Sequence, residues 1–155
     1  MNNKIKSIFQ LFLPVVLGSL IGLLISNYID YNTLIKPPLA PPKLLFPIAW
    51  TIIYLLMGIS YYLYKKDIYE ETETTKKITI IYYLQLFINL LWSIIFFILK
   101  NRLLASLWII ILDLLVIYLI YLFFKEKKIS AYLNIPYLLW ILFATYLTIG
   151  IYLLN

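Results

Sequence analysis

Five long apolar stretches, separated by short polar segments, dominate the pattern of the chain. They cover residues 8–27, 46–64, 78–99, 103–124 and 132–154. Each is close to the roughly 20 residues that a helix needs to cross a hydrocarbon core about 30 Å thick. Because lipid offers no partners to free backbone groups, each span must be helical. The pattern predicts an all-α integral membrane protein: a single transmembrane domain over residues 1–155, built as a five-helix bundle.

The first connecting segment, residues 28–45, differs from the others in its prolines. The four are Pro37, Pro38, Pro41 and Pro42. Each proline drives the residue before it towards extended geometry, so the segment KPPLAPP should be a stiff, polyproline-like strap. Two interpretations remain open. The strap is either a spacer between two helices or a lid folded over the bundle.

The distribution of positive charge predicts an orientation. The N-terminal end and the segments on the same side carry nine Lys and Arg residues, including Lys4 and Lys6, whereas the opposite side carries four. Because basic residues accumulate on the cytoplasmic side, we expect a multi-pass protein of the cell membrane with a cytoplasmic N-terminus. The 28–45 loop would then face outward. The net charge of +6 is explained by topology and contact with anionic lipid, so no nucleic-acid partner is expected.

Composition agrees with a membrane protein and excludes several other classes. Apolar residues make up 64% of the chain and charged residues 13%, whereas soluble domains are near half apolar and about a quarter charged. The chain has no Cys and no His, which excludes disulfides, thiol chemistry, an imidazole base and a His-ligated metal. We therefore expect no bound metal, no cofactor and no hydrolytic activity.

Polar and aromatic side chains recur at helical spacing within the spans. In the third span, Gln85, Asn89 and Ser93 are spaced i, i+4, i+8, with Trp92 and Phe96 beside them. Polar side chains are costly in lipid, so this face should turn towards other helices or a cavity. Interhelical hydrogen bonding and ligand binding are both consistent with that position.

Two further spans carry an aromatic-plus-small face. Trp50 and Tyr54 lie four residues apart in the second span, and Trp140, Ala144 and Thr148 follow the same spacing in the fifth. If these faces converge with the third span, they would enclose a flat-walled cavity for a planar aromatic ligand. The alternative is an aromatic-rich core without a cavity.

An acidic residue and a pair of glycines also lie within the predicted spans. Asp113 lies about ten residues into the fourth span, where a carboxylate is costly, so it should point to a neighbouring helix or a polar cleft. It is either a structural group or a proton-coupling site. Gly18 and Gly22 form a small-xxx-small run that permits close helix approach, either within the bundle or in a homodimer.

Several motifs in order resemble the TspO/translocator-protein family (TspO/MBR), also called peripheral-type benzodiazepine receptors, in its bacterial type. They are KPPLAPP at 36–42, FPIAWTIIYLLMG at 46–58, NLLWS at 89–93, PYLLW at 136–140 and FATYL at 143–147. The resemblance covers nearly the whole chain. It implies a five-helix bundle, often dimeric, with a pocket capped by the loop between the first two helices.

The resemblance also implies a function and a set of site residues. Family members bind porphyrins such as protoporphyrin IX and haem, so a tetrapyrrole receptor or carrier is the first expectation. By motif position, the ligand-binding residues are Tyr31, Pro41, Trp50, Tyr54, Asn89, Trp92, Phe96, Trp140, Ala144 and Thr148. The propionates of a porphyrin could meet Lys36, Lys43 or Arg102 by charge attraction.

Two alternative functions accompany that expectation. One is an enzyme that degrades porphyrins with light and oxygen, in which Trp50 and Trp140 act as the catalytic pair. The other is a small proton-coupled exporter that uses Asp113. The sequence departs from the family pattern at Trp108, which stands where members often carry an acidic residue, and after Tyr152, where the basic residue of the family's sterol pattern is missing.

Overall fold

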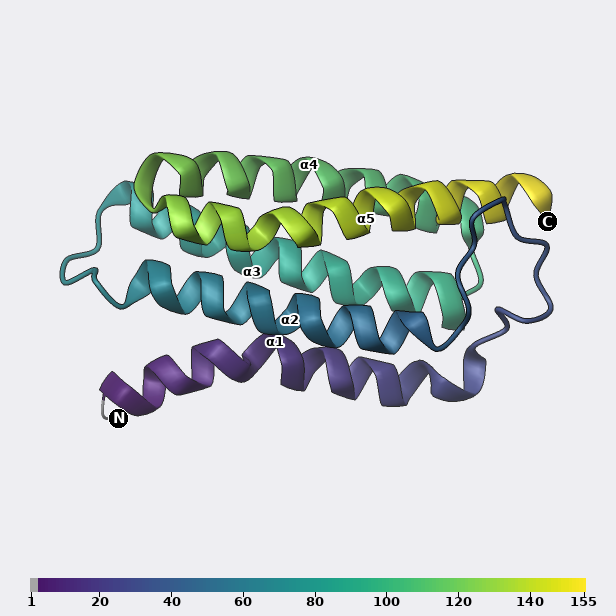
Figure 1. Ribbon diagram of the computed structural model, residues 1–155, viewed down its shortest axis with the longest axis horizontal. Coiled ribbons are helices and arrows are strands. Elements are labelled where there is room, and N and C mark those ends of the chain that lie inside the picture. The colour runs from purple at the N-terminus through teal and green to yellow at the C-terminus, as the bar shows by residue number, and fades with distance from the viewer. Residues whose placement is uncertain (1–2) are drawn as a thin grey trace.

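The computed structural model describes residues 3–155, with side chains from residue 8 onward. Residues 1 and 2 of the predicted domain, and the side chains of Lys4 and Lys6, lie outside that description. Five helices run along one long axis (Figure 1): α1 Asn3–Ile25, α2 Leu45–Lys65, α3 Glu73–Ser93, α4 Arg102–Glu126 and α5 Lys128–Leu154. A 3-10 turn, η1 (Ser26–Tyr28), extends α1, and a π-helical turn, η2 (Ile94–Ile98), extends α3. By length and composition, all five helices can cross a membrane. The predicted class, an all-α membrane protein, is confirmed.

The observed helices begin and end close to the predicted spans, with the largest differences at helix starts. The third helix begins at Glu73, five residues earlier than expected, because the Thr72 hydroxyl accepts a hydrogen bond from the Thr75 amide at 3.2 Å. Such a cap satisfies one of the free amides of the first turn. At α4, the Asn101 side chain accepts from the Leu104 amide at 3.0 Å. The apolar pattern alone could not show these polar first turns.

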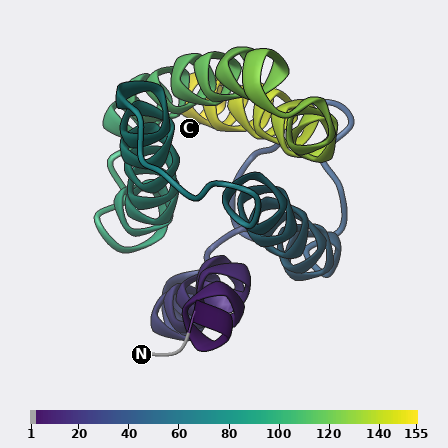
Figure 2. The same ribbon diagram turned by 90° about the vertical axis from the view of Figure 1, so that its left-hand side faces the viewer.

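The helices form an open ring when viewed end on (Figure 2), in the order α1, α2, α5, α4, α3. Helix α1 packs mainly on α2, at two glycines. A side chain at Gly58 would strike the backbone oxygen of Leu11, and one at Gly18 would strike the Tyr54 ring. Close backbone approach therefore requires glycine at both positions.

Four buried polar side chains inside the ring are hydrogen-bonded in a chain. The Tyr54 hydroxyl donates to Asn89 Oδ1 at 2.7 Å, and Asn89 Nδ2 donates to the Tyr137 hydroxyl at 3.0 Å. The Tyr137 hydroxyl in turn donates to Gln85 Oε1 at 2.8 Å. This chain joins α2, α3 and α5, and it explains why amide side chains are tolerated in a membrane-spanning helix.

Candidate functional site

A cavity of about 770 Å³ lies between α1, α2, the α3–η2 segment and α5, at the end of the bundle covered by the 28–45 loop. Its size is within the range of about 300–1,000 Å³ typical of small-molecule sites. The walls are mostly apolar. The lining residues are Val15, Gly18, Ser19, Ile21, Gly22, Leu23, Ile25, Ile29, Tyr31, Lys43, Leu44, Phe46, Pro47, Trp50, Thr51, Tyr54, Trp92, Ser93, Phe96, Phe97, Ala144, Leu147, Thr148 and Ile151.

Seven of the ten residues expected at the ligand site lie on the cavity wall: Tyr31, Trp50, Tyr54, Trp92, Phe96, Ala144 and Thr148. The other three each contact a member of this set. The Pro41 carbonyl accepts a hydrogen bond from the Tyr31 hydroxyl at 2.8 Å, and Asn89 Oδ1 accepts one from the Tyr54 hydroxyl. The Trp140 ring stands edge-on to Trp50, with centroids 6.4 Å apart. The structure therefore brings all ten together, three of them as supports.

Two stacked aromatic pairs contribute to the wall. Trp50 and Tyr54 on α2 stack at 5.4 Å between centroids, with 26° between planes. Trp92 and Phe96 stack at 5.2 Å with the same interplanar angle. These rings give the cavity flat, polarizable surfaces, which favour contact with another planar aromatic system.

The π-helical turn η2 brings two consecutive phenylalanines to the cavity. The Leu99 amide donates to the Ile94 carbonyl at 3.0 Å, a five-residue step instead of the usual four. Phe96 and Phe97 both line the cavity. The guanidinium of Arg102 lies 4.0 Å from the Phe96 ring centroid and donates to the Phe96 carbonyl. Arg102 thus fixes this part of the wall from behind.

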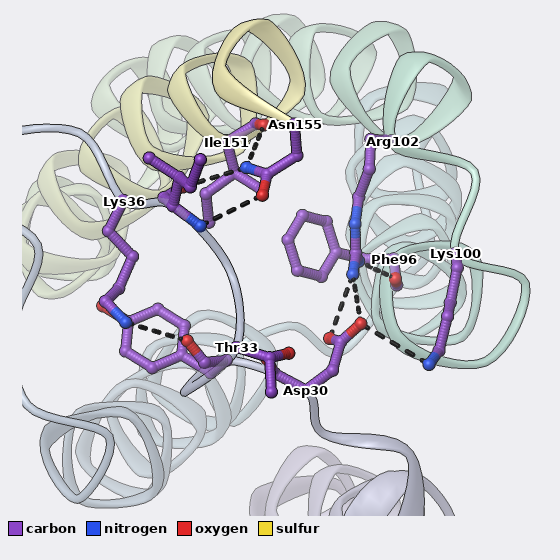
Figure 3. A network of polar contacts seen from close by, with 10 residues as sticks. Asp30, Thr33, Lys36, Phe96, Lys100, Arg102, Ile151 and Asn155 are labelled. Atoms are coloured by element: carbon purple, nitrogen blue, oxygen red, sulfur yellow. Dashed lines mark hydrogen bonds and ion pairs between the residues drawn. The ribbon is translucent and has the colours of Figure 1, made fainter.

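The 28–45 loop is held against the bundle at several points, which favours the lid over the plain spacer. Arg102 pairs with Asp30 at the start of the loop, as Figure 3 shows. Farther along, Asn155 exchanges two hydrogen bonds with the backbone of Ile35, at 3.0 and 2.9 Å. The Tyr146 hydroxyl donates to the Pro38 carbonyl at 2.7 Å. The loop also contributes Tyr31, and burial raises the pKa of its phenol.

Helix α1 supplies wall residues that the sequence did not assign to the ligand site. Gly18 and Gly22 both line the cavity, although their spacing predicted only close helix packing. Gly18 faces the Tyr54 ring, and a side chain built at Gly22 would meet no atom within 4 Å. Small residues at i and i+4 are the signal that could have identified this face, because they leave room beside the aromatic wall.

Asp113 lies apart from the cavity, at the contact between α4 and α5. The Thr145 hydroxyl donates to Asp113 Oδ2 at 2.8 Å, which confirms that this carboxylate points to a neighbouring helix. Its second oxygen has no hydrogen-bond partner among the described residues. Of the residues described in α4, none belongs to the cavity wall. Asp113 is therefore not part of the cavity wall.

The polar chemistry available at the cavity is that of indoles, phenols, Ser and Thr hydroxyls and one lysine. Within residues 3–155, no three side chains of His, Cys, Asp or Glu come close enough to hold a metal ion. Trp92 lines the cavity, and its indole N–H has no hydrogen-bond partner in the described part of the chain.

Comparisons with known proteins agree on one family. The family model described as "TspO/MBR family" matches residues 10–154. The chain is 42% identical over 120 residues to "Tryptophan-rich protein TspO" of Archaeoglobus fulgidus, covering 77% of this chain and 76% of that protein. It is 35% identical over 143 residues to "Translocator protein homolog" of Schizosaccharomyces pombe (92% and 87%). The "Tryptophan-rich sensory protein" of Cereibacter sphaeroides is 31% identical over 115 residues (74% and 70%).

Proposed function

The chain belongs to the TspO/MBR family, and from this premise we propose that it is a membrane receptor or carrier for porphyrins and related planar aromatic ligands. Protoporphyrin IX and haem are the ligands that the motif resemblance implies. The observation that carries the proposal is the pair of flat stacks, Trp50–Tyr54 and Trp92–Phe96, on the wall of one apolar cavity. Planar π-systems gain both apolar burial and stacking energy against such walls.

Metal-free porphyrin should bind at least as well as haem. Axial ligands for iron come mainly from His, Cys, Met or Tyr side chains. The chain has no His and no Cys, and the hydroxyls of Tyr31 and Tyr54 are already donated within the protein. The expected affinity therefore comes from the macrocycle and its substituents.

Trp fluorescence in detergent tests this proposal. Protoporphyrin IX should quench the Trp fluorescence of the wild-type protein, and the quenching should saturate as the porphyrin concentration rises. Ala144→Phe places a ring inside the cavity and should weaken binding by at least about tenfold. Leu139→Phe is the matched control, because Leu139 lies on the same helix and is 63% exposed. Equal affinity in both variants would place the ligand outside this cavity.

A light-dependent porphyrin-degrading enzyme is the second candidate, favoured by the Trp pair. Trp140 stands edge-on to Trp50 at 6.4 Å, and Trp50 stacks on Tyr54 at 5.4 Å. Such short separations allow an electron to pass between these rings, and Trp50, on the cavity wall, would be the direct donor to a photo-excited porphyrin. The test is a new porphyrin product that needs both light and oxygen. Equal turnover in wild type and in Trp50→Phe/Trp140→Phe would remove this candidate.

The orientation of the protein is part of the proposal. The excess of Lys and Arg at the N-terminal end of the bundle supports a cytoplasmic N-terminus and an outward-facing 28–45 loop. Since the chain has no Cys, single cysteines can report on each side. Leu39 is 84% exposed and Tyr69 is 96% exposed, at opposite ends. An impermeant thiol reagent added to intact cells should label Leu39→Cys and spare Tyr69→Cys; the reverse pattern would invert the orientation.

A homodimer in the membrane is also proposed, on the strength of the family resemblance. Gly22 is the better candidate of the two glycines for a contact with a second copy, because Gly18 already packs against Tyr54 of the same chain. Crosslinking in membranes tests it directly. A single band at the mass of the monomer, in membranes that retain porphyrin binding, would contradict the dimer.

A further inference from the structure

Positive side chains surround the loop-covered end of the bundle, and most of them are already paired. Lys36 donates from Nζ to the Tyr31 carbonyl at 3.0 Å and lies 4.9 Å from the centroid of the Tyr31 ring. These contacts hold one part of the 28–45 loop to another. Lys36 therefore serves the internal structure of the loop.

The next two cations share one carboxylate. Arg102 donates to both oxygens of Asp30, at 3.0 and 2.8 Å, and Lys100 Nζ lies 3.5 Å from Asp30 Oδ2 (Figure 3). Arg102 also donates to the Phe96 carbonyl. Its side chain is nearly buried, at 11% exposure. A ligand could recruit this guanidinium only by breaking the pair with Asp30.

Lys43 differs from these three in both its position and its contacts. It lines the cavity directly, and it is the one charged residue among the 24 that the described cavity wall contains. Among side chains of residues 8–155, none forms a hydrogen bond or ion pair with the Lys43 ammonium. The neighbouring wall residues Leu44, Phe46 and Pro47 are apolar. An exposed lysine on an otherwise uncharged wall leaves one site for an anion.

We propose that Lys43 is the anchor for a carboxylate of the bound ligand, so that the cavity prefers planar aromatic acids to neutral analogues of the same shape. This inference rests on the proposed function and names the class of ligand within it. The four-carbon stem of lysine lets its ammonium follow a carboxylate at the mouth while the ring system lies against the aromatic wall. Charge complementarity of this kind sets specificity. No acidic residue lines the described wall to oppose it.

The competing explanation is a lysine that reaches lipid phosphate, as basic residues near helix ends do. The two sources of negative charge can be separated. In a neutral detergent no lipid phosphate is present, so any preference for acid over ester measured there comes from the ligand. A Lys43 effect that appears only in discs of anionic lipid, and that is equal for acid and ester, would assign the ammonium to lipid and overturn the inference.

The experiment compares protoporphyrin IX with its dimethyl ester, which keeps the ring and removes both carboxylates. Quenching of Trp fluorescence in neutral detergent gives Kd for wild type, Lys43→Gln and Lys128→Gln. Lys128→Gln is the control: it removes one positive charge, as Lys43→Gln does, but at the opposite end of the bundle, where Lys128 begins α5. Wild type should bind the acid about twofold to fivefold more tightly than the ester, as a partly exposed ion pair allows. Lys43→Gln should abolish this ratio by weakening the binding of the acid.

The outcomes separate the Lys43 anchor from porphyrin binding itself. A ratio that survives in Lys43→Gln, or that falls equally in Lys128→Gln, overturns the anchor while porphyrin binding itself stands. Added salt should reduce the wild-type ratio towards that of Lys43→Gln, because a partly exposed ion pair is screened. Binding of neither porphyrin to the wild-type protein would overturn the proposed function, and the inference with it.

Discussion

One nitrogen of the Arg102 guanidinium donates to both carboxylate oxygens of Asp30, at 3.0 and 2.8 Å. The same guanidinium lies over the Phe96 ring, 4.0 Å from its centroid. The start of the lid loop, the first residue of α4 and the aromatic wall of the cavity therefore meet at one side chain. Since α1 packs mainly on α2, this pair also links the loop after α1 to the α3–α4 corner.

Asp30→Asn should loosen the lid. The change leaves a partly buried guanidinium without its carboxylate, which should cost about 1–3 kcal/mol of stability. Porphyrin should dissociate faster, as measured by stopped-flow recovery of Trp fluorescence. Asp67→Asn is the control, because Asp67 pairs with Lys127 at 2.6 Å at the opposite end. Identical dissociation rates in the two variants would show that the Asp30 pair does not hold the lid.

The two glycines of α1 should respond differently to leucine. In Gly18→Leu the new side chain strikes Tyr54, so α1 should separate from α2, with a loss of about 1–3 kcal/mol in stability. Gly22→Leu meets no atom within 4 Å of its Cβ, so thermal unfolding should stay near wild type. Because Gly22 lines the cavity, its leucine should nevertheless weaken porphyrin binding.

Crosslinking in membranes extends that comparison to the dimer. If Gly22→Leu abolishes the crosslinked dimer while porphyrin still binds normally, Gly22 belongs to the seam between copies, and its predicted effect on porphyrin binding is wrong.

The sequence predicts the spans well because each apolar run is near 20 residues, whereas helix starts depend on side-chain caps. The first turn of α3, beginning at Glu73, is polar and therefore resembles a loop in composition. Thr72 makes it helical through a hydrogen bond that hydropathy does not record.

The candidate site was predictable to the extent that aromatic residues recur every fourth position. Helical spacing places Trp50 and Tyr54 on one face, and the cavity lies on that face. Helical spacing does not show how far a side chain lies from the cavity. Asn89 was therefore expected on the wall, but it forms hydrogen bonds with Tyr54 and Tyr137 instead. Gly22 was missed as a wall residue because its spacing from Gly18 was interpreted only as close helix packing.

The lid should open at high pH through Tyr31. Its hydroxyl donates to the Pro41 carbonyl at 2.8 Å, and a phenolate cannot donate. Burial raises the pKa of Tyr31 above its usual value of about 10. The stabilising contribution is therefore complete below about pH 10 and is lost as the pH rises through the raised pKa of the folded state. Porphyrin dissociation should accelerate in that range.

Tyr31→Phe isolates this effect from the titration of other tyrosines. The variant lacks the hydroxyl, so its dissociation rate at neutral pH should already exceed that of wild type, and the difference between the two should vanish above the transition. A constant difference across the whole pH range would contradict the assignment to Tyr31.

Asp113→Asn should behave nearly as wild type in folding and porphyrin binding. The amide keeps the shape and can still accept the hydrogen bond that Thr145 donates at 2.8 Å. Porphyrin transport into vesicles with an imposed pH gradient tests whether Asp113 couples proton movement to transport. A defect confined to this variant, with binding intact, would make Asp113 a proton-coupling site and favour the exporter over the receptor.

A structure of the protein with protoporphyrin IX bound tests the central claim most directly. The account predicts density for the macrocycle inside the cavity, in contact with Trp50 and Trp92 and covered by the 28–45 loop, with one propionate near Lys43. Density for the macrocycle on the outer, lipid-facing surface of the helices, with this cavity empty, would contradict it.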